Sequence, residues 1–88
     1  MYRRVEFLDP YYDSVLRLER CPKTFLALGL LVFAAAACGE MVAPLDDTDI
    51  RAIITTGEAG LPLLRLYFFI EDGVPNIMHV ETYDEWEP

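Results

Sequence analysis

Five side chains in the second half of the chain are of types that carry out acid–base or charge-stabilising chemistry: Arg51, Arg65, His79, Glu81 and Tyr83. An arginine can stabilise negative charge that develops during a reaction, and a histidine or a glutamate can accept or donate a proton. His79, Glu81 and Tyr83 follow one another at intervals of two residues, which places them on one face of a strand. The sequence therefore predicts a candidate site on the polar face of a sheet.

The elements that position these residues are three segments with a period of two, predicted as the strands of an antiparallel meander: IRAIIT (50–55), LLRLYFFI (63–70) and NIMHVETY (76–83). Asp72-Gly73 predicts a tight turn between the second and third segments. Strict alternation places these side chains on one common face: Arg51, Arg65, Tyr67, His79, Glu81 and Tyr83.

The same alternation assigns the opposite face of the meander to the core. In the second segment this face is wholly apolar, with Leu64, Leu66 and Phe68. In the first segment it would carry Ile50, Ala52 and Ile54, and in the third Met78 and Val80.

The first half of the chain predicts one strand and two helices. Residues 2–8 alternate as a strand, and Asp9-Pro10 is typical of a helix cap and first helical residue, opening a helix over 10–20. Pro22 opens a second helix, and Gly39 ends it. The expected fold is a single small α+β domain over residues 1–88, in which a strand, a two-helix hairpin and an antiparallel meander form two layers.

The second helix contains an uncharged run of fifteen residues, Thr24–Cys38. As a helix this run is about 22 Å long, shorter than the ~30 Å hydrocarbon core of a bilayer. The alternative is a lipoprotein signal ending at Cys38, but four acidic residues precede the run, where secretory signals have a short basic start. We expect a buried helix and no membrane as partner. Cys21 and Cys38 lie too far apart on it to form a disulfide, which favours a reduced, cytoplasmic setting.

The charge of the chain is strongly acidic and unevenly distributed. Seven basic and fifteen acidic residues give a formal net charge of −8. Residues 1–38 hold five basic and four acidic side chains, whereas residues 39–88 hold two basic and eleven acidic ones. Such a surface repels phosphates, so the charge disfavours nucleic acid as a partner and suits docking onto a basic protein.

The order of elements, together with short strand motifs, resembles the RelE/ParE toxin superfamily of bacterial toxin–antitoxin systems. The motifs are VEFLDP before the first helix, DIRAI, LLRLYFFIEDG and NIMHV. Arg51 falls where many members carry an arginine in the second strand, and Arg65 falls in the third-strand segment that resembles their YRxxY motif.

This resemblance implies two kinds of activity and one kind of partner. RelE-like members are ribosome-dependent endoribonucleases, ParE-like members inhibit DNA gyrase, and a cognate antitoxin protein neutralises either kind. In an RNA-cleaving site, Arg65 or Arg51 would stabilise the pentavalent phosphorane, and Glu81 or His79 would deprotonate the ribose hydroxyl. The chain departs from the nucleases where they are basic: LDDTD precedes the second strand and VETYDEWEP follows His79.

Each candidate residue also has a structural interpretation. Arg51 and Arg65 could pair with Glu81 across strands, His79 could be a hydrogen-bonded structural residue, and the tyrosines suit strands by propensity alone. No second histidine or cysteine stands at metal-ligand spacing, and Asp46, Asp47 and Asp49 lack the pattern of a calcium loop, so we expect no metal and no cofactor.

Two functions from different classes remain. The first is a RelE/ParE-like toxin-fold protein that acts through protein partners, namely a cognate antitoxin or a target protein. The second is a small acidic inhibitor or immunity-type protein that covers a basic surface. A homodimer formed through the apolar helix is a further partner arrangement.

Overall fold

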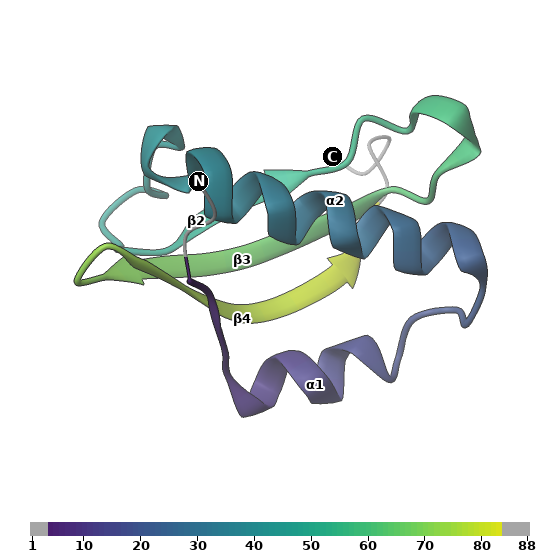
Figure 1. Cartoon of the computed structure of the whole chain (residues 1–88), viewed down its shortest axis with the longest axis horizontal. Coiled ribbons are helices and arrows are strands. Elements are labelled where there is room, and N and C mark those ends of the chain that lie inside the picture. Colours follow the sequence, from purple (N-terminus) through teal and green to yellow (C-terminus); the bar gives the residue numbers. More distant parts are fainter. Residues whose placement is uncertain (1–3, 84–88) are drawn as a thin grey trace.

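The order of elements confirms the expected sequence of one strand, two helices and three strands (Figure 1). The structure is a computed structural model that describes residues 4–83. Its helices and strands are β1 (Glu6–Phe7), α1 (Asp9–Val15), α2 (Pro22–Cys38), β2 (Arg51–Ile54), β3 (Leu64–Glu71) and β4 (Val74–Thr82). Two single turns of 3₁₀ helix lie between them: η1 (Gly39–Met41) and η2 (Glu58–Gly60).

The four strands form one sheet in the order β1-β4-β3-β2. The pairs β2–β3 and β3–β4 are antiparallel, which confirms the meander, whereas β1 pairs in parallel with β4 through Glu6 and Phe7. The complete sheet is therefore mixed. Of the strand expected over residues 2–8, only Glu6–Phe7 pairs with the sheet, and residues 1–3 lie outside the described part of the chain.

The turn between β3 and β4 is the one that Asp72-Gly73 predicts. Both residues adopt positive φ, 52° at Asp72 and 78° at Gly73, and Glu71 pairs with Val74 directly after the turn. Two central residues with positive φ are the signature of a type I′ turn, whose twist matches that of the strands it joins. This turn sets the starting register of the hairpin that carries the candidate site.

The two helices begin close to the expected residues. Helix α2 has Pro22 in its first turn and ends at Cys38, as predicted. Helix α1 begins at Asp9 with Leu8 as its cap, because the Leu8 N–H donates to the Ile77 carbonyl at 3.0 Å and so still belongs to the sheet. It ends at Val15 and is shorter than expected.

Gly39 ends α2 for a reason other than backbone freedom. Its φ is −58°, an ordinary helical value, so no left-handed conformation requires a glycine there. A Cβ atom at this position would lie 2.9 Å from the Phe68 ring. The glycine is therefore needed because the end of α2 lies directly against β3.

The helices cover one face and one edge of the sheet (Figure 1). Helix α2 lies over one face of the sheet, and α1 runs alongside β4. The core between them takes Ala27, Leu28, Leu31 and Ala35 from α2, Leu64, Leu66 and Phe68 from β3, Ile77 and Val80 from β4, and Tyr11 and Leu18 from α1. The apolar face predicted for β3 is thus confirmed, since its three core side chains are at most 1 % exposed.

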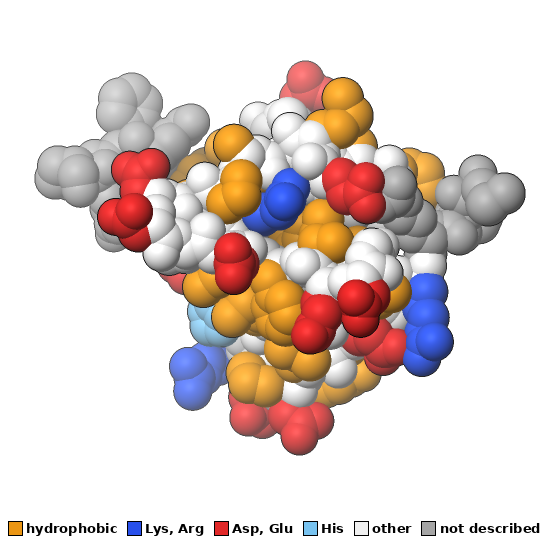
Figure 2. Space-filling model, turned by 90° about the vertical axis from the view of Figure 1, so that its left-hand side faces the viewer, with side chains coloured by type: hydrophobic (Ala, Val, Ile, Leu, Met, Phe, Trp, Pro, Cys, Tyr) orange, Lys and Arg blue, Asp and Glu red, His pale blue; other side chains and the backbone are white. Residues whose placement is uncertain are grey.

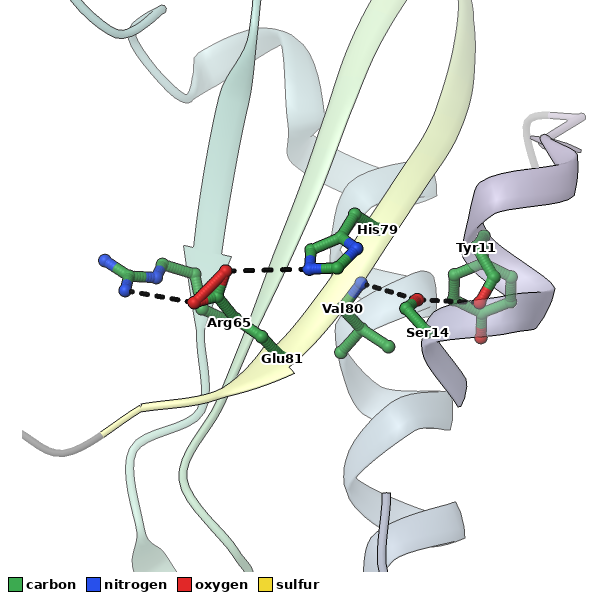
Figure 3. Close-up of polar contacts among 6 residues, drawn as sticks. All are labelled: Tyr11, Ser14, Arg65, His79, Val80 and Glu81. Carbon is green, nitrogen blue, oxygen red and sulfur yellow. Dashed lines mark hydrogen bonds and ion pairs between the residues drawn. The ribbon is translucent and has the colours of Figure 1, made fainter. Parts of the chain in front are cut away.

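Ser14 of α1 replaces a neighbouring strand along part of the β4 edge. Its buried Oγ donates to the Tyr11 carbonyl at 2.7 Å and accepts the Val80 N–H at 3.1 Å (Figure 3). Because β1 pairs with β4 only at Asn76 and Ile77, the Val80 amide would otherwise point away from the sheet without a strand partner. This hydroxyl ties α1 to the strand that carries His79 and Glu81.

Helix α2 is also the most membrane-like segment of the described chain. An 18-residue window within Pro22–Met41 has a mean hydropathy of 1.9, which is enough by length and composition to cross a membrane. In the structure it instead packs against the sheet with Ala27, Leu31 and Ala35, each at most 3 % exposed. The helix is therefore an integral part of a two-layer domain.

Candidate functional site

Four of the five predicted site residues lie together on the face of the sheet opposite α2. Strand register places Arg65 of β3 directly across from Glu81 of β4, and Tyr67 directly across from His79. Directly paired residues in antiparallel strands point to the same face. The Arg65–Glu81 and Tyr67–His79 pairs therefore lie next to each other on this face. Tyr83 follows the end of β4 and joins them, as its contact with Arg65 shows.

Arg65 is at the centre of this group. Its guanidinium carbon lies 5.6 Å from the ring centroids of both Tyr67 and Tyr83, a distance typical of cation–π contacts. Its NH2 nitrogen lies 3.6 Å from one carboxylate oxygen of Glu81, and His79 Nε2 lies 3.6 Å from the other (Figure 3). We call Arg65, Tyr67, His79, Glu81 and Tyr83 the arginine–tyrosine cluster.

The two tyrosines hold the cluster in place from opposite sides. Tyr83 donates its phenolic O–H to the Thr55 carbonyl at 3.1 Å, and its N–H donates to the Leu63 carbonyl at 3.2 Å. The Tyr67 ring lies 5.9 Å from the His79 ring. The guanidinium of Arg65 thus has two aromatic rings and one carboxylate as neighbours, which favour its observed orientation.

The pKa of Tyr67 is raised above its ordinary value. Burial is the main cause because it disfavours the phenolate, and the negative charge of Glu81 adds to it, while the positive charge of Arg65 opposes the shift. Tyr67 is therefore protonated at neutral pH and is a hydrogen-bond donor.

Arg51 lies on the other face, so its expected place beside Arg65 is wrong. It pairs with Phe68, a core residue, and Ile53 pairs with Leu66, so both point toward α2. Arg51 NH1 donates to the carbonyls of Gly39, Glu40 and Val42 at 3.2, 2.9 and 2.7 Å. These groups follow the C-terminus of α2, where free carbonyls and the helix dipole attract a cation.

The core face expected for β2 is wrong because this strand is apolar on both faces. Ile50 and Ile54 favour one orientation of the strand, and Ile53 favours the other. The structure buries Ile53 against the core and leaves Ile54 exposed beside Arg65. Only the pairing with β3 separates the two orientations, since a shift of one residue reverses every side chain of a strand.

A β-bulge at Met78 changes which side chains of β4 point into the core. Tyr67 pairs with His79, but Phe68 pairs with Ile77, so Met78 is an extra residue opposite this step. Uninterrupted alternation along residues 76–83 would place Ile77 on the face of His79 and Met78 on the core face, yet Ile77 is fully buried together with Val80, whereas Met78 is only partly buried. The bulge is what allows Ile77 and Val80 to point inward while His79 and Glu81 point outward.

A hollow beside the cluster involves residues that the sequence did not single out. It has a volume of about 210 Å³ and lies between α1 and the end of β4, lined by Ser14, Arg17 and Leu18 together with His79, Glu81 and Thr82. Arg17 lies on the exposed side of its segment and belongs to no motif, so only the docking of α1 against β4 brings it near Glu81.

Arg65 is already paired within the cluster. The positive charge of Arg65 faces Glu81, which lowers its attraction for an anion, and the Nε of Arg65 has no hydrogen-bond partner among residues 4–83. The side chains of Arg65, His79 and Glu81 are each 39 % exposed, so a partner can reach them without a conformational change. This cluster offers aromatic rings, a guanidinium and a carboxylate on the open face of the sheet.

Exposed acidic side chains are concentrated at the end of the sheet remote from Arg65 and Glu81. Residues 43–49, which include Asp46, Asp47 and Asp49, are all exposed. The end of the molecule that carries the β3–β4 turn shows acidic side chains spread around exposed hydrophobic ones (Figure 2).

The fold and the site thus define a small two-layer α+β domain with an arginine–tyrosine cluster on its open sheet face. Comparison with protein-family models, with curated proteins and with solved structures finds no significant match to the chain.

Proposed function

We propose that the protein is a RelE/ParE-like toxin-fold component of a toxin–antitoxin-type system, and that it acts by binding another protein through the arginine–tyrosine cluster. The element order and the strand motifs support the family, and the cluster supports the mode of action. The cytoplasm, where both the antitoxin and the target proteins of such systems reside, is its proposed location.

The observation that carries this proposal is the position of Arg65. Its guanidinium lies over two tyrosine rings and beside Glu81 while 39 % of the side chain stays exposed. Tyrosine and arginine are among the residues most enriched at energetic centres of protein interfaces, because they offer a large contact area together with hydrogen-bond donors. A side chain that is already held in one orientation loses little entropy when a partner binds.

Two features of the structure weigh against RNA cleavage as the activity. Arg51 donates to the carbonyls after α2 on the opposite face, so Arg65 is the only one of the two candidate arginines in the cluster. The formal charge of −8 also opposes contact with a phosphate backbone. We therefore propose action on a protein, with nucleic acid disfavoured.

The acidic loop before β2 supports a second candidate, a small inhibitor or immunity-type protein for a basic partner. Residues 43–49 hold three exposed aspartates within a half of the chain that has a net charge of −9. Binding through these carboxylates would weaken strongly as salt is raised, whereas binding through the aromatic cluster would not. The salt dependence of the measured affinity therefore separates the two candidates.

Inducible expression in a bacterium tests the first candidate. Expression of the wild-type protein should arrest growth, and Arg65→Ala should relieve the arrest, while total RNA from the arrested cells stays uncleaved. Arg4→Ala is the matched control, because Arg4 is an exposed arginine at the N-terminal edge, outside the cluster. Immunoblots must show equal soluble levels of the three proteins. Harmless wild-type expression, or an arrest that Arg65→Ala leaves unchanged, contradicts the proposal.

A further inference from the structure

The outward face of α2 is apolar and exposed, although the helix belongs to the core. Phe25 and Leu26 are each 56 % exposed and Leu30 is 51 % exposed, while Ala27, Leu28 and Leu31 of the same helix pack on the sheet. Gly29 lies between them on the exposed side. We call Phe25, Leu26, Gly29 and Leu30 the outer face of α2.

Neighbouring elements extend this surface on both sides. At the N-terminal end, a groove of about 280 Å³ separates Phe25 from Leu16 of the segment after α1, and Leu16 is 66 % exposed. At the other end, a hollow of about 190 Å³ is lined by Leu30, Ala34, Ile53, Ile54 and Leu61. The outer face of α2 therefore has the projecting ring of Phe25 at one end and an apolar hollow at the other.

The exposed apolar area of the outer face of α2 and its neighbours has the size of the largest apolar patch on a typical monomer, which is often functional. Half-exposed side chains of this kind each leave roughly 100 Å² in contact with water, so Leu16, Phe25, Leu26, Leu30 and Phe33 present about 500 Å². A stable interface buries about 800 Å² on each partner. The exposed apolar side chains of this surface supply more than half of that area, and the groove and the hollow beside them add to it.

Gly29 is unexplained within a single copy of the protein. It lies inside a helix of ordinary conformation, and a Cβ atom at this position would meet nothing within 4 Å. Glycine weakens a helix interior relative to alanine, so the fold gains nothing from it here. A glycine in the middle of an exposed helical face permits close approach by another backbone.

We propose that two copies of the protein associate through the outer face of α2, with the two helices antiparallel and crossing at Gly29 and Leu30. These residues lie at the middle of α2 (Pro22–Cys38), so a twofold axis there overlaps the two helices along their full length. The same axis places Phe25 of each copy opposite Ala34 of the other, at the apolar hollow. The Phe25 ring of each copy then enters the hollow of the other copy. The same contact occurs twice, as the twofold symmetry of an isologous interface requires.

Charge favours a second copy over a basic protein as the occupant. Residues 24–38 carry no charged side chain, so two identical faces meet without repulsion although each chain has a charge of −8. A surface built for a basic partner would instead display acidic residues. The arginine–tyrosine cluster lies on the opposite side of the sheet and stays accessible in both copies. This inference is independent of the function proposed above.

A charge exchange at Leu30 tests the proposal. Since Leu30 lies next to its own symmetry mate, Leu30→Lys and Leu30→Glu should each weaken self-association at least about tenfold, because like charges then meet at the axis. An equimolar mixture of the two variants should restore the dimer mass, because opposite charges then meet. Met41→Glu is the control, since Met41 is 86 % exposed but lies beyond α2. Mass is measured by light scattering after gel filtration, and circular dichroism verifies the fold.

Two further measurements strengthen the test. Gly29→Leu should weaken the dimer without lowering the thermal stability of the monomer, because its side chain enters open space in a single copy. Raising the salt concentration should strengthen the wild-type dimer, because salt screens the repulsion between two acidic chains. A monomeric wild-type protein at micromolar concentration, a mixture of the Leu30 variants that stays monomeric, or a monomer that binds phosphatidylcholine vesicles instead overturns the proposal.

Discussion

At the scale of single residues, two arginines that the sequence treats alike have separate roles in the structure. Arg65 lies on the open face between two tyrosine rings, and Arg51 lies on the helix side with one nitrogen shared by three carbonyls. The first is half-exposed and paired with a carboxylate. The second joins the start of β2 to the end of α2 and so has a structural task.

This difference predicts unequal effects on stability. Arg51→Ala should lower the free energy of unfolding by about 2 kcal/mol, because hydrogen bonds from a charged group to the carbonyls are lost. Arg65→Ala should lower it by less than ~1 kcal/mol, because solvent screens an exposed ion pair. Urea denaturation of both variants beside the wild type gives the two values. Equal losses, or a larger loss for Arg65→Ala, would show that Arg51 does not hold the helix end.

At the scale of elements, the bulge at Met78 decides which side chains of β4 reach the candidate site. Without the extra residue, Ile77 would share the face of His79 and Glu81, as uninterrupted alternation predicts. With it, Ile77 and Val80 both enter the core. Ser14 then fixes this part of β4 to α1 through the Val80 amide.

Alanine substitution on either side of the bulge checks the register. Ile77→Ala should cost about 2 to 5 kcal/mol of unfolding free energy, because it leaves a cavity in a fully buried position. Met78→Ala should cost clearly less, because the Met78 side chain is only partly buried. Thermal or urea unfolding distinguishes the two. The opposite ranking would mean that β4 alternates without a bulge and that the cluster has a different composition.

At the scale of the whole molecule, a strong acidic charge is combined with an exposed apolar helix face. The acidic residues are concentrated in residues 39–88, whereas Thr24–Cys38 has no charge at all. Like charge keeps separate molecules apart in solution, and the uncharged face is the region where they can meet.

Solubility should therefore depend steeply on pH. As the pH falls toward the isoelectric point of about 4.3, the carboxylates take up protons and the repulsion between molecules vanishes. We expect a solubility minimum near that pH and recovery above pH ~6, measured as the protein concentration left in solution after centrifugation. Leu26→Lys, which adds charge to the outer face of α2, should raise the solubility at the minimum. A solubility that is flat between these pH values would contradict this reasoning.

Local signals in the sequence were enough to predict the elements and their order. Pro22 and Gly39 bracket α2, Asp72-Gly73 forms the expected hairpin turn, and the alternation in β3 identifies its buried face. Each of these signals acts over a few residues, through backbone geometry or the period of a strand. The placement of Arg65, His79, Glu81 and Tyr83 on one face followed from the same alternation.

Long-range contacts decided what those signals leave open. The orientation of β2 depends on its pairing with β3, because β2 offers isoleucines to both faces, and so the face of Arg51 was decided only there. The shift at Met78 and the docking of Ser14 against Val80 likewise join residues far apart in the chain. The sequence by itself determined an acidic α+β chain with a polar strand face and one apolar helix. Tertiary packing decided which arginine belongs to that face and which part of the helix stays exposed, because strand pairing and helix docking select between local arrangements of nearly equal energy.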